Sequence, residues 1–147
     1  MSAELIQKLR DNGVQPSAQR LAVAQYVLTT TEHPSAERVL ERVQKRFPML
    51  SRATVYNTLN LFVEKGLIRQ LVIAEGKSVF DPVLTPHHHF VDEVTGRIED
   101  VPWSAVKVGA VSGLKDYDVR EYMVVMRGRK LGGSRGAGKR SSPKKSR

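Results

Sequence analysis

Residues 81–100 read Asp-Pro-Val-Leu-Thr-Pro-His-His-His-Phe-Val-Asp-Glu-Val-Thr-Gly-Arg-Ile-Glu-Asp, a segment in which three consecutive histidines follow a lone carboxylate and precede an acidic group. The 147-residue chain has four histidines, and the fourth, His33, lies far upstream. Pro82 and Pro86 break regular structure ahead of the three histidines. Helical periodicity before this segment gives way to strand periodicity after it, which predicts two small domains joined by a hinge at residues 81–86.

Composition excludes several classes of protein. Cysteine is absent, so disulfides, thiolate zinc sites, iron–sulfur clusters and cysteine nucleophiles are excluded, and any metal must be held by His, Asp or Glu. No apolar run approaches the roughly 20 residues of a membrane-spanning helix. The first residues show a polar helical pattern that differs from a signal peptide. We therefore expect a cytoplasmic protein.

The formal net charge of +9 is unevenly distributed. Residues 127–147 contain nine Lys or Arg and no acid, residues 1–80 have eleven basic against seven acidic side chains, and residues 81–126 have four against eight. A basic first part favours nucleic acid as a partner, and an acidic middle favours a cation. Residues 128–147 have almost no apolar side chains, which predicts a disordered basic tail. This tail either adds salt-sensitive attraction to nucleic acid or only raises solubility.

Four helices are predicted before the hinge. Their apolar side chains recur at three and four residues, and the expected ranges are residues 2–12, 17–29, 36–47 and 52–65. Ser17 and Ser51 are expected N-caps, and Gly13 and Gly66 stand where left-handed residues end helices. Residues 67–73 and 77–80 then flank a short turn with glycine, which predicts a β-hairpin. A hairpin after a helix-turn-helix is typical of a winged helix.

The helix predicted at residues 52–65 presents polar side chains opposite its apolar stripe. These candidate DNA-reading residues are Arg52, Thr54, Tyr56, Asn57 and Asn60. Arginine binds phosphate or guanine, asparagine pairs with adenine, and an aromatic ring or a Thr methyl contacts thymine. The alternative is the solvated face of an ordinary helix, but the preceding helix, the hairpin and the local basic excess favour double-stranded DNA. Arg20, Arg69 and Lys77 are predicted phosphate contacts.

Strands are expected after the hinge. Residues 87–92 and 97–101 flank a turn and predict a second hairpin, residues 117–126 predict a third strand, and residues 104–114 predict a weak helix interrupted by two glycines. Residues two apart in a strand face the same way, so His87 and His89 are expected to project together while His88 points elsewhere. If the hairpin closes at residues 92–97, Asp100 lies beside His89.

Two further side chains complete a candidate metal site. Asp81 lies at the domain junction, close to the histidines, and His33 precedes the third predicted helix. Together the five residues form a set of three imidazoles and two carboxylates, which suits Fe²⁺, Mn²⁺, Zn²⁺ or Ni²⁺, and the oxygen ligands favour iron or manganese. The alternative is a histidine-rich loop that merely lies in solvent.

With these motifs in place, residues 4–127 resemble the Fur family of metal-dependent transcriptional repressors. The motifs are residues 9–13 with Gln19-Arg20, His33-Pro34-Ser35-Ala36, residues 51–59, Phe80-Asp81 and residues 87–89. The resemblance implies an α+β fold, with a winged-helix DNA-binding domain at residues 1–80 and an α/β dimerisation and metal-sensing domain at residues 87–127. It also implies a homodimer that binds a palindromic operator when metal is bound.

The resemblance further implies that the regulatory ligands are His33, Asp81, His87, His89 and Asp100. Aspartate at position 100 is typical of the peroxide-sensing, PerR-like branch, whereas iron-uptake repressors usually have glutamate. In that branch Fe²⁺ reacts with peroxide and a ligand histidine is oxidised, which here would be His33 or His87, and the DNA is released. Fe²⁺ or Mn²⁺ is the expected cofactor, and Zn²⁺ could bind in vitro.

The chain also departs from the family pattern. Most relatives hold a structural zinc with two Cys-x-x-Cys pairs, but Asp92 and Thr95 stand at the first pair, so no such zinc is expected. The cysteine-free, three-histidine pattern also resembles the haem-responsive, Irr-like branch. Two other classes remain as alternatives, a small metal-dependent enzyme and a constitutive DNA-binding module. The enzyme is disfavoured because no general base or nucleophile stands out beside the histidines.

Overall fold

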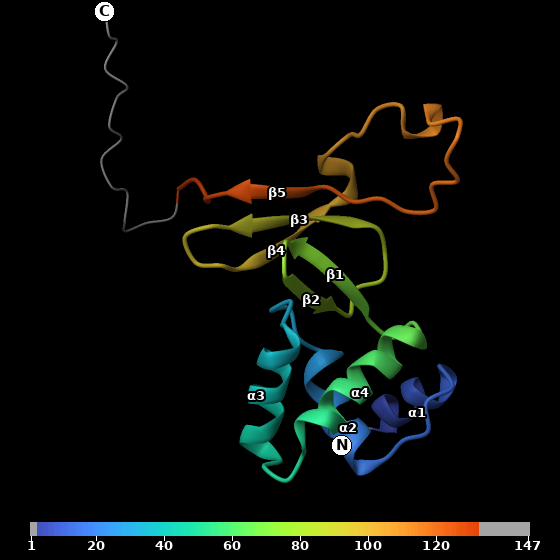
Figure 1. Cartoon of the computed structure of the whole chain (residues 1–147), viewed down its shortest axis with the longest axis vertical. Coiled ribbons are helices and arrows are strands. Elements are labelled where there is room, and N and C mark those ends of the chain that lie inside the picture. Colours follow the sequence, from blue (N-terminus) through green and yellow to red (C-terminus); the bar gives the residue numbers. More distant parts are fainter. Residues whose placement is uncertain (1–2, 133–147) are drawn as a thin grey trace, which may run out of the picture.

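The computed structural model of the chain describes residues 3–132, in which four helices are followed by two small β-sheets (Figure 1). The helices are α1 (Ala3–Asp11), α2 (Ala18–Val27), α3 (Ala36–Arg46) and α4 (Arg52–Glu64). All four predicted helices are confirmed to within about two residues. Among the described residues no helix is long and apolar enough to cross a membrane. Most of the predicted basic tail, residues 133–147, lies outside the described residues.

The sequence signals at the helix ends act as predicted. The side chain of Ser17 accepts a hydrogen bond from the Arg20 N–H, and Ser51 does the same for Thr54. Gly13 and Gly66 have φ angles of +73° and +71°, a left-handed conformation that glycine adopts without steric cost. The apolar faces of the helices then share one core, which runs from Leu9 to Phe80.

The hairpin that follows α4 consists of β1 (Arg69–Ala74) and β2 (Lys77–Asp81), which pair antiparallel. It lies between the helices and the second sheet (Figure 1). Of its buried apolar residues, Phe80 joins the core of the helices, whereas Leu71, Ile73 and Val79 form a small second cluster. Partly buried side chains of the chain's second half, Val91, Ile98, Met123 and Val125, pack against this cluster. The predicted wing is therefore docked by one face on the second sheet, and the two halves share an apolar contact.

The second sheet has the strand order β4-β3-β5. The outer strands β4 (Ile98–Pro102) and β5 (Val125–Gly128) flank β3 (His87–Asp92), β4 antiparallel to it and β5 parallel. The register pairs His89 with Asp100, which confirms the expected hairpin. The functional division at residues 81–86 stays a prediction, although β2 ends and β3 begins at its two limits.

Two predictions for residues 104–126 are wrong. In place of a helix at residues 104–114 the chain forms two short 3₁₀ turns, η1 (Trp103–Ala105) and η2 (Val111–Gly113). Glycine at positions 109 and 113 disfavours helix, and Ala110 adopts a φ of +60°, which interrupts the segment. The strand predicted at residues 117–126 is present only at residues 125–126, where β5 begins, and within the described part of the chain no strand pairs with residues 117–123.

Candidate metal centre

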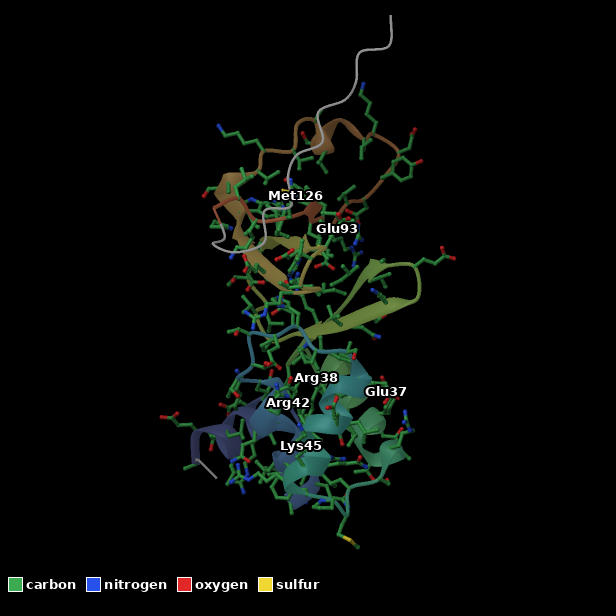
Figure 2. The ribbon with its side chains drawn as sticks, turned by 90° about the vertical axis from the view of Figure 1, so that its left-hand side faces the viewer. Glu37, Arg38, Arg42, Lys45, Glu93 and Met126 are labelled. Carbon is green, nitrogen blue, oxygen red and sulfur yellow. The ribbon has the colours of Figure 1, made fainter. Side chains whose placement is uncertain are left out.

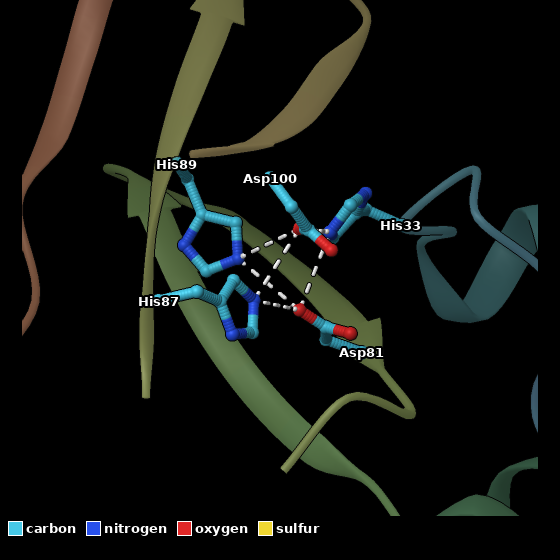
Figure 3. A group of neighbouring side chains, drawn as sticks. All are labelled: His33, Asp81, His87, His89 and Asp100. Atoms are coloured by element: carbon cyan, nitrogen blue, oxygen red, sulfur yellow. Dashed lines mark hydrogen bonds and ion pairs between the residues drawn. The ribbon is translucent and has the colours of Figure 1, made fainter. Parts of the chain in front are cut away.

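The five predicted metal ligands meet at the junction of the helices and the second sheet (Figure 3). His33 comes from the loop before α3, Asp81 from the end of β2, His87 and His89 from β3, and Asp100 from β4. Each residue offers one donor atom, and the five atoms all lie within 4.8 Å of one another. A cluster drawn from both halves of the chain therefore converges on one point.

Backbone hydrogen bonds explain this convergence. Strand alternation and the β3–β4 register place His87, His89 and Asp100 on one face of the second sheet. The Phe80 N–H donates to the carbonyl of Pro34 at 2.9 Å, which holds the loop that carries His33 against β2. His33 itself has a φ of +52°, which is uncommon for a residue other than glycine.

The three imidazoles point the same ring nitrogen at two carboxylate oxygens. Oδ2 of Asp81 lies 2.8 Å from Nε2 of His87, 3.1 Å from that of His89 and 3.3 Å from that of His33. Oδ1 of Asp100 lies 2.7 Å from Nε2 of His33, 3.3 Å from that of His87 and 3.6 Å from that of His89. Each imidazole thus faces both carboxylates through a single atom.

The hydrogen bond of His87 shows that this arrangement needs a cation. Its Nδ1 lies 2.6 Å from the carbonyl oxygen of Thr85. A carbonyl can only accept, so Nδ1 carries the proton, and Nε2 of the neutral ring has a free electron pair. This pair would face the Asp81 carboxylate at 2.8 Å. The contact is attractive only if a second proton or a metal ion lies between the two atoms.

The pKa values of the cluster shift in the directions that mutual attraction requires. Burial on its own would lower the pKa of His33, but the hydrogen bond and the charge of Asp81 outweigh it and raise the pKa. The pKa of His87 is also raised, because its bonds to Thr85 and Asp81 outweigh burial. Burial would raise the pKa of the Asp81 carboxyl, but hydrogen bonds from the histidines and the Val83 N–H hold it far below its usual range.

The site is closed on one side and open on the other. The side chain of Asp81 is 1% exposed, whereas that of Asp100 is 40% exposed. A cleft of about 1080 Å³ lies between the two halves and reaches His33 and Asp100, and cations from both halves line it, among them Arg38, Lys77 and Arg97. A small molecule from solvent can therefore approach the cluster from the Asp100 side.

The separations also fit a divalent ion. Metal–ligand bonds of about 2.0–2.2 Å place ligands at right angles about 3 Å apart, and the nitrogen–oxygen separations of 2.7–3.6 Å bracket that value. Imidazole and carboxylate donors without thiolate suit iron, manganese or zinc. Nδ1 of His33 and of His89 are buried, and neither has a hydrogen-bond partner among the described residues. Only the His87 ring is oriented by an outer partner that the structure displays.

His88 lies on the other face of β3, as predicted. It is fully buried, its ring stacks on Trp103 at 4.5 Å between centroids, and its Nδ1 accepts the Val124 N–H at 3.0 Å. Trp103 in turn contacts Tyr122. The middle histidine therefore connects β3 to the chain segment before β5 and takes no part in the five-residue cluster.

The predicted DNA-reading residues are distributed over α4. Arg52, Asn57 and Asn60 are exposed, and Thr54 and Tyr56 are partly exposed. Asn57, Thr54 and Arg20 line a groove of about 400 Å³ between α4 and the start of α2.

The predicted phosphate contacts of the hairpin lie apart from this groove. Arg69 pairs with Glu121 at 3.5 Å, and Lys77 lines the cleft beside the metal cluster.

Sequence reasoning missed Glu37. It lies on α3, and its carboxylate accepts hydrogen bonds from Arg52 and from the Tyr56 hydroxyl. The hydrogen bond from Arg52 lowers the pKa of the Glu37 carboxyl, and the bond to Glu37 raises the pKa of Tyr56. No short-range sequence pattern predicts these contacts, because Arg52 and Tyr56 follow Glu37 by 15 and 19 residues.

Asp92 and Thr95, which replace a cysteine pair, form the turn between β3 and β4. Oδ1 of Asp92 accepts the Val94 N–H at 2.9 Å, and the Thr95 hydroxyl accepts the Arg97 N–H at 3.2 Å. Hydrogen bonds led by that of Val94 lower the pKa of the Asp92 carboxyl. The turn is thus held by side-chain caps on its own backbone.

Comparisons with known proteins identify the family to which this sequence is similar. Residues 11–124 match the ferric uptake regulator family. The chain is 36% identical over 97 residues to the peroxide operon regulator of Bacillus subtilis, covering 66% of this chain and 67% of that protein. It is 29% identical over 127 residues to the peroxide-responsive repressor PerR of Staphylococcus aureus, covering 85% and 86%.

Solved structures show the same fold. A zinc-bound manganese uptake regulator matches with a TM-score of 0.66 at 22% identity and covers 86% of this chain and 98% of its own. The peroxide stress regulator of Campylobacter jejuni matches with a TM-score of 0.63 at 24% identity, and it covers 90% and 99%.

Proposed function

We propose a sensing function for this chain, which belongs to the ferric uptake regulator family and is a metal-dependent transcriptional repressor, not an enzyme. The protein senses peroxide, or iron and manganese status, through a metal site formed by His33, Asp81, His87, His89 and Asp100. The observation that carries the proposal is that these ligands come from both halves of the chain. His33 belongs to the helical half, whereas His87, His89 and Asp100 belong to the second sheet. A site that draws on both halves can control how they are oriented.

The mechanism follows from the contacts. A bound divalent metal supplies the positive charge that the converging Nε2 electron pairs and carboxylates require. With the metal bound, His33 would hold the loop before α3 against β2 and β3, and Asp81 would hold the end of β2 against β3. This arrangement favours the orientation of α4 that fits DNA, as expected when a ligand prefers one of two conformations.

The similarity to peroxide regulators supports peroxide as the signal. The B. subtilis and S. aureus proteins are named as peroxide regulators, and Asp100 follows the pattern that the family resemblance gives for the peroxide branch. The cleft that reaches His33 and Asp100 supports the proposal, because peroxide needs access to the ligands. His33 and His87 are the proposed sites of oxidation, and Fe²⁺ or Mn²⁺ is the proposed cofactor.

A haem-responsive function is less well supported. His88 is fully buried, its Nδ1 is occupied by the Val124 N–H, and Trp103 covers one face of its ring. A haem iron would need an open imidazole nitrogen, and Nε2 of His88 is buried. The three-histidine motif therefore divides into two metal-directed rings and one structural ring.

We also propose a homodimer on a palindromic operator, as the family fold implies. Family members bind operator DNA as dimers. The support within this chain is the large apolar surface left exposed after β4, which Trp103, Val108, Leu114, Tyr117, Val119 and Tyr122 form. Sedimentation of the Mn²⁺-loaded protein should give twice the mass of one chain.

Operator binding before and after peroxide tests the proposal. A duplex selected from a random library with Mn²⁺-loaded protein serves as the probe. We expect tight binding with Mn²⁺ or Fe²⁺, weak binding with chelator, and loss of binding after peroxide with Fe²⁺ only. Mass spectrometry should then find one added oxygen on His33 or His87. Equal affinity in chelator and in metal would contradict metal sensing, and insensitivity of the Fe²⁺ form to peroxide would leave only iron or manganese sensing.

A further inference from the structure

A cluster of three side chains joins α3 to the first turns of α4. Arg52 donates from Nη1 to Oε1 of Glu37 and from Nη2 to Oε2 at 3.4 Å. The Tyr56 hydroxyl donates to the same Oε1 at 2.9 Å, and Nη1 of Arg52 also lies 3.2 Å from the Tyr56 oxygen. The guanidinium carbon of Arg52 lies 5.6 Å from the centre of the Tyr56 ring. One carboxylate thus restrains both side chains.

This cluster contributes little to stability. The side chains of Arg52 and Glu37 are 61% and 62% exposed. Exposed ion pairs contribute about 0–1 kcal/mol, because water and salt screen them and ordering long side chains costs entropy. Both carboxylate oxygens of Glu37 are nevertheless bound. The contacts are therefore better explained by the orientation that they impose on Arg52 and Tyr56.

Glu37 lies beside the surface that we propose to bind DNA. Figure 2 shows Glu37 to the side of the row that Arg38, Arg42 and Lys45 form along α3. Arg52 and Tyr56 lie on the α4 face that we propose to read DNA. A carboxylate at such a surface repels phosphates, so on electrostatic grounds alone it weakens DNA binding. Its contacts must then provide something other than affinity.

We propose that Glu37 is a positioning residue for DNA specificity, which holds the Arg52 fork and the Tyr56 hydroxyl in one arrangement so that they read base edges. The proposal rests on the proposed DNA-reading role of α4. Arginine has five N–H donors in a rigid plane, and the bonds to Glu37 leave the others in a defined orientation. A free Arg52 would instead satisfy itself on any nearby phosphate, which carries no sequence information.

The test compares Glu37→Gln with Glu41→Gln in the Mn²⁺-loaded protein. Glu41 lies one turn further along α3, its side chain is 56% exposed, and among residues 3–132 its ion pair is with Arg38, at 3.4 Å. Both variants remove one negative charge. The measurements are the affinities for the selected duplex and for a scrambled duplex of the same length, each over a range of salt concentrations.

We expect Glu37→Gln to reduce the ratio of the two affinities roughly tenfold, in line with the discrimination that a good arginine contact provides. Its binding to the scrambled duplex should become more salt-dependent by about one counterion. Glu41→Gln should keep the wild-type ratio. As a second variant, Arg52→Lys keeps the positive charge but lacks the guanidinium fork. Its ratio of affinities for the selected and the scrambled duplex should fall as it does in Glu37→Gln.

Three outcomes overturn the proposal. The first is an equal ratio in Glu37→Gln and Glu41→Gln, and the second is a wild-type ratio in Arg52→Lys. The third is unfolding of Glu37→Gln at a markedly lower temperature than the wild type, which would assign Glu37 a structural role. A failure of the proposed function is seen separately, as wild-type protein that binds the selected duplex equally with and without Mn²⁺.

Discussion

Two clusters of charged side chains adjoin the start of α3, and they differ in burial. The cluster of His33, Asp81, His87, His89 and Asp100 is centred on a carboxylate that is 1% exposed, whereas Glu37, at the centre of the other, is 62% exposed. Buried charges must be compensated inside the protein, because water cannot do it. Exposed charges are also solvated by water, so their ion pairs contribute little to stability. The first cluster therefore suits a tightly held ion and the second a surface that DNA approaches and leaves.

Removing the buried carboxylate should have the largest effect. Asp81→Asn removes the charge that faces all three imidazoles and replaces an anionic oxygen ligand by a neutral amide, which is a weaker ligand. Loss of an outer-shell partner alone costs about 10–100-fold in metal affinity, so we expect Mn²⁺ affinity to fall by roughly 100-fold or more. Isothermal titration with Mn²⁺ measures it.

The matched control is Asp92→Asn, also at a buried aspartate, which caps the β3–β4 turn. It should bind Mn²⁺ as the wild type does. Similar losses in both variants would show that replacing any buried aspartate lowers Mn²⁺ affinity, and would contradict the role of Asp81 as a metal ligand.

His88 is buried but lies outside both clusters, and replacing it should lower the stability of the fold. His88→Ala removes the acceptor of the Val124 N–H and the stacking partner of Trp103. An unsatisfied buried donor costs about 1–3 kcal/mol, so we expect the free energy of unfolding to fall by roughly 2 kcal/mol in urea denaturation of the metal-free protein. Trp103→Leu keeps the hydrogen bond and should cost less. A larger loss in Trp103→Leu would assign the role to stacking.

The buried cluster should make metal-free stability and metal affinity change oppositely with pH. The raised pKa values of His33 and His87 stabilise the fold below their usual value of 6.5, and this contribution is lost as the pH rises through the raised values. The lowered pKa of Asp81 contributes above 3.8 and is lost at lower pH. The cluster therefore stabilises the metal-free protein most between pH 3.8 and 6.5.

Metal binding needs neutral imidazoles, so Mn²⁺ affinity should rise as the pH increases above 6.5, with release of protons at pH 7. Titrations in two buffers of different ionisation enthalpy measure the released protons. Binding without proton release would contradict the raised pKa values of His33 and His87.

The exposed cluster should give the smallest effect. Glu37→Gln breaks the ion pair with Arg52, yet the free energy of unfolding should change by less than about 0.5 kcal/mol. Urea denaturation of this variant beside Asp81→Asn compares the two clusters directly. A loss of 2 kcal/mol or more would place Glu37 among the structural residues.

The sequence predicted the helical half closely because its signals are local. Ser17, Ser51 and Gly66 each mark a helix end within a few residues, and the apolar stripes repeat with a helical period. The five-residue cluster could be anticipated for a similar reason, since strand alternation and one hairpin register align His87, His89 and Asp100. The position of His33 was less accessible, because it depends on the bond between Phe80 and Pro34 across the chain.

The segment after β4 could not be predicted in this way. In residues 101–132 no residue is fully buried, and of residues 117–126 only Met123 and Val125 pack against the small core of the β1–β2 hairpin, so the apolar pattern did not predict a full strand. The role of Glu37 was hidden for another reason, because its partners lie on a different helix. Patterns along the chain describe faces, whereas contacts between helices depend on how those faces are packed.

If metal and DNA favour the same orientation of the two halves, their binding must be thermodynamically linked. If Mn²⁺ strengthens binding of the selected duplex, the duplex must strengthen binding of Mn²⁺ by the same factor. The measurement is the Mn²⁺ affinity of the wild-type protein with and without saturating duplex. We predict an affinity at least roughly tenfold higher with the duplex, within the usual range of such couplings. An unchanged Mn²⁺ affinity would contradict the account.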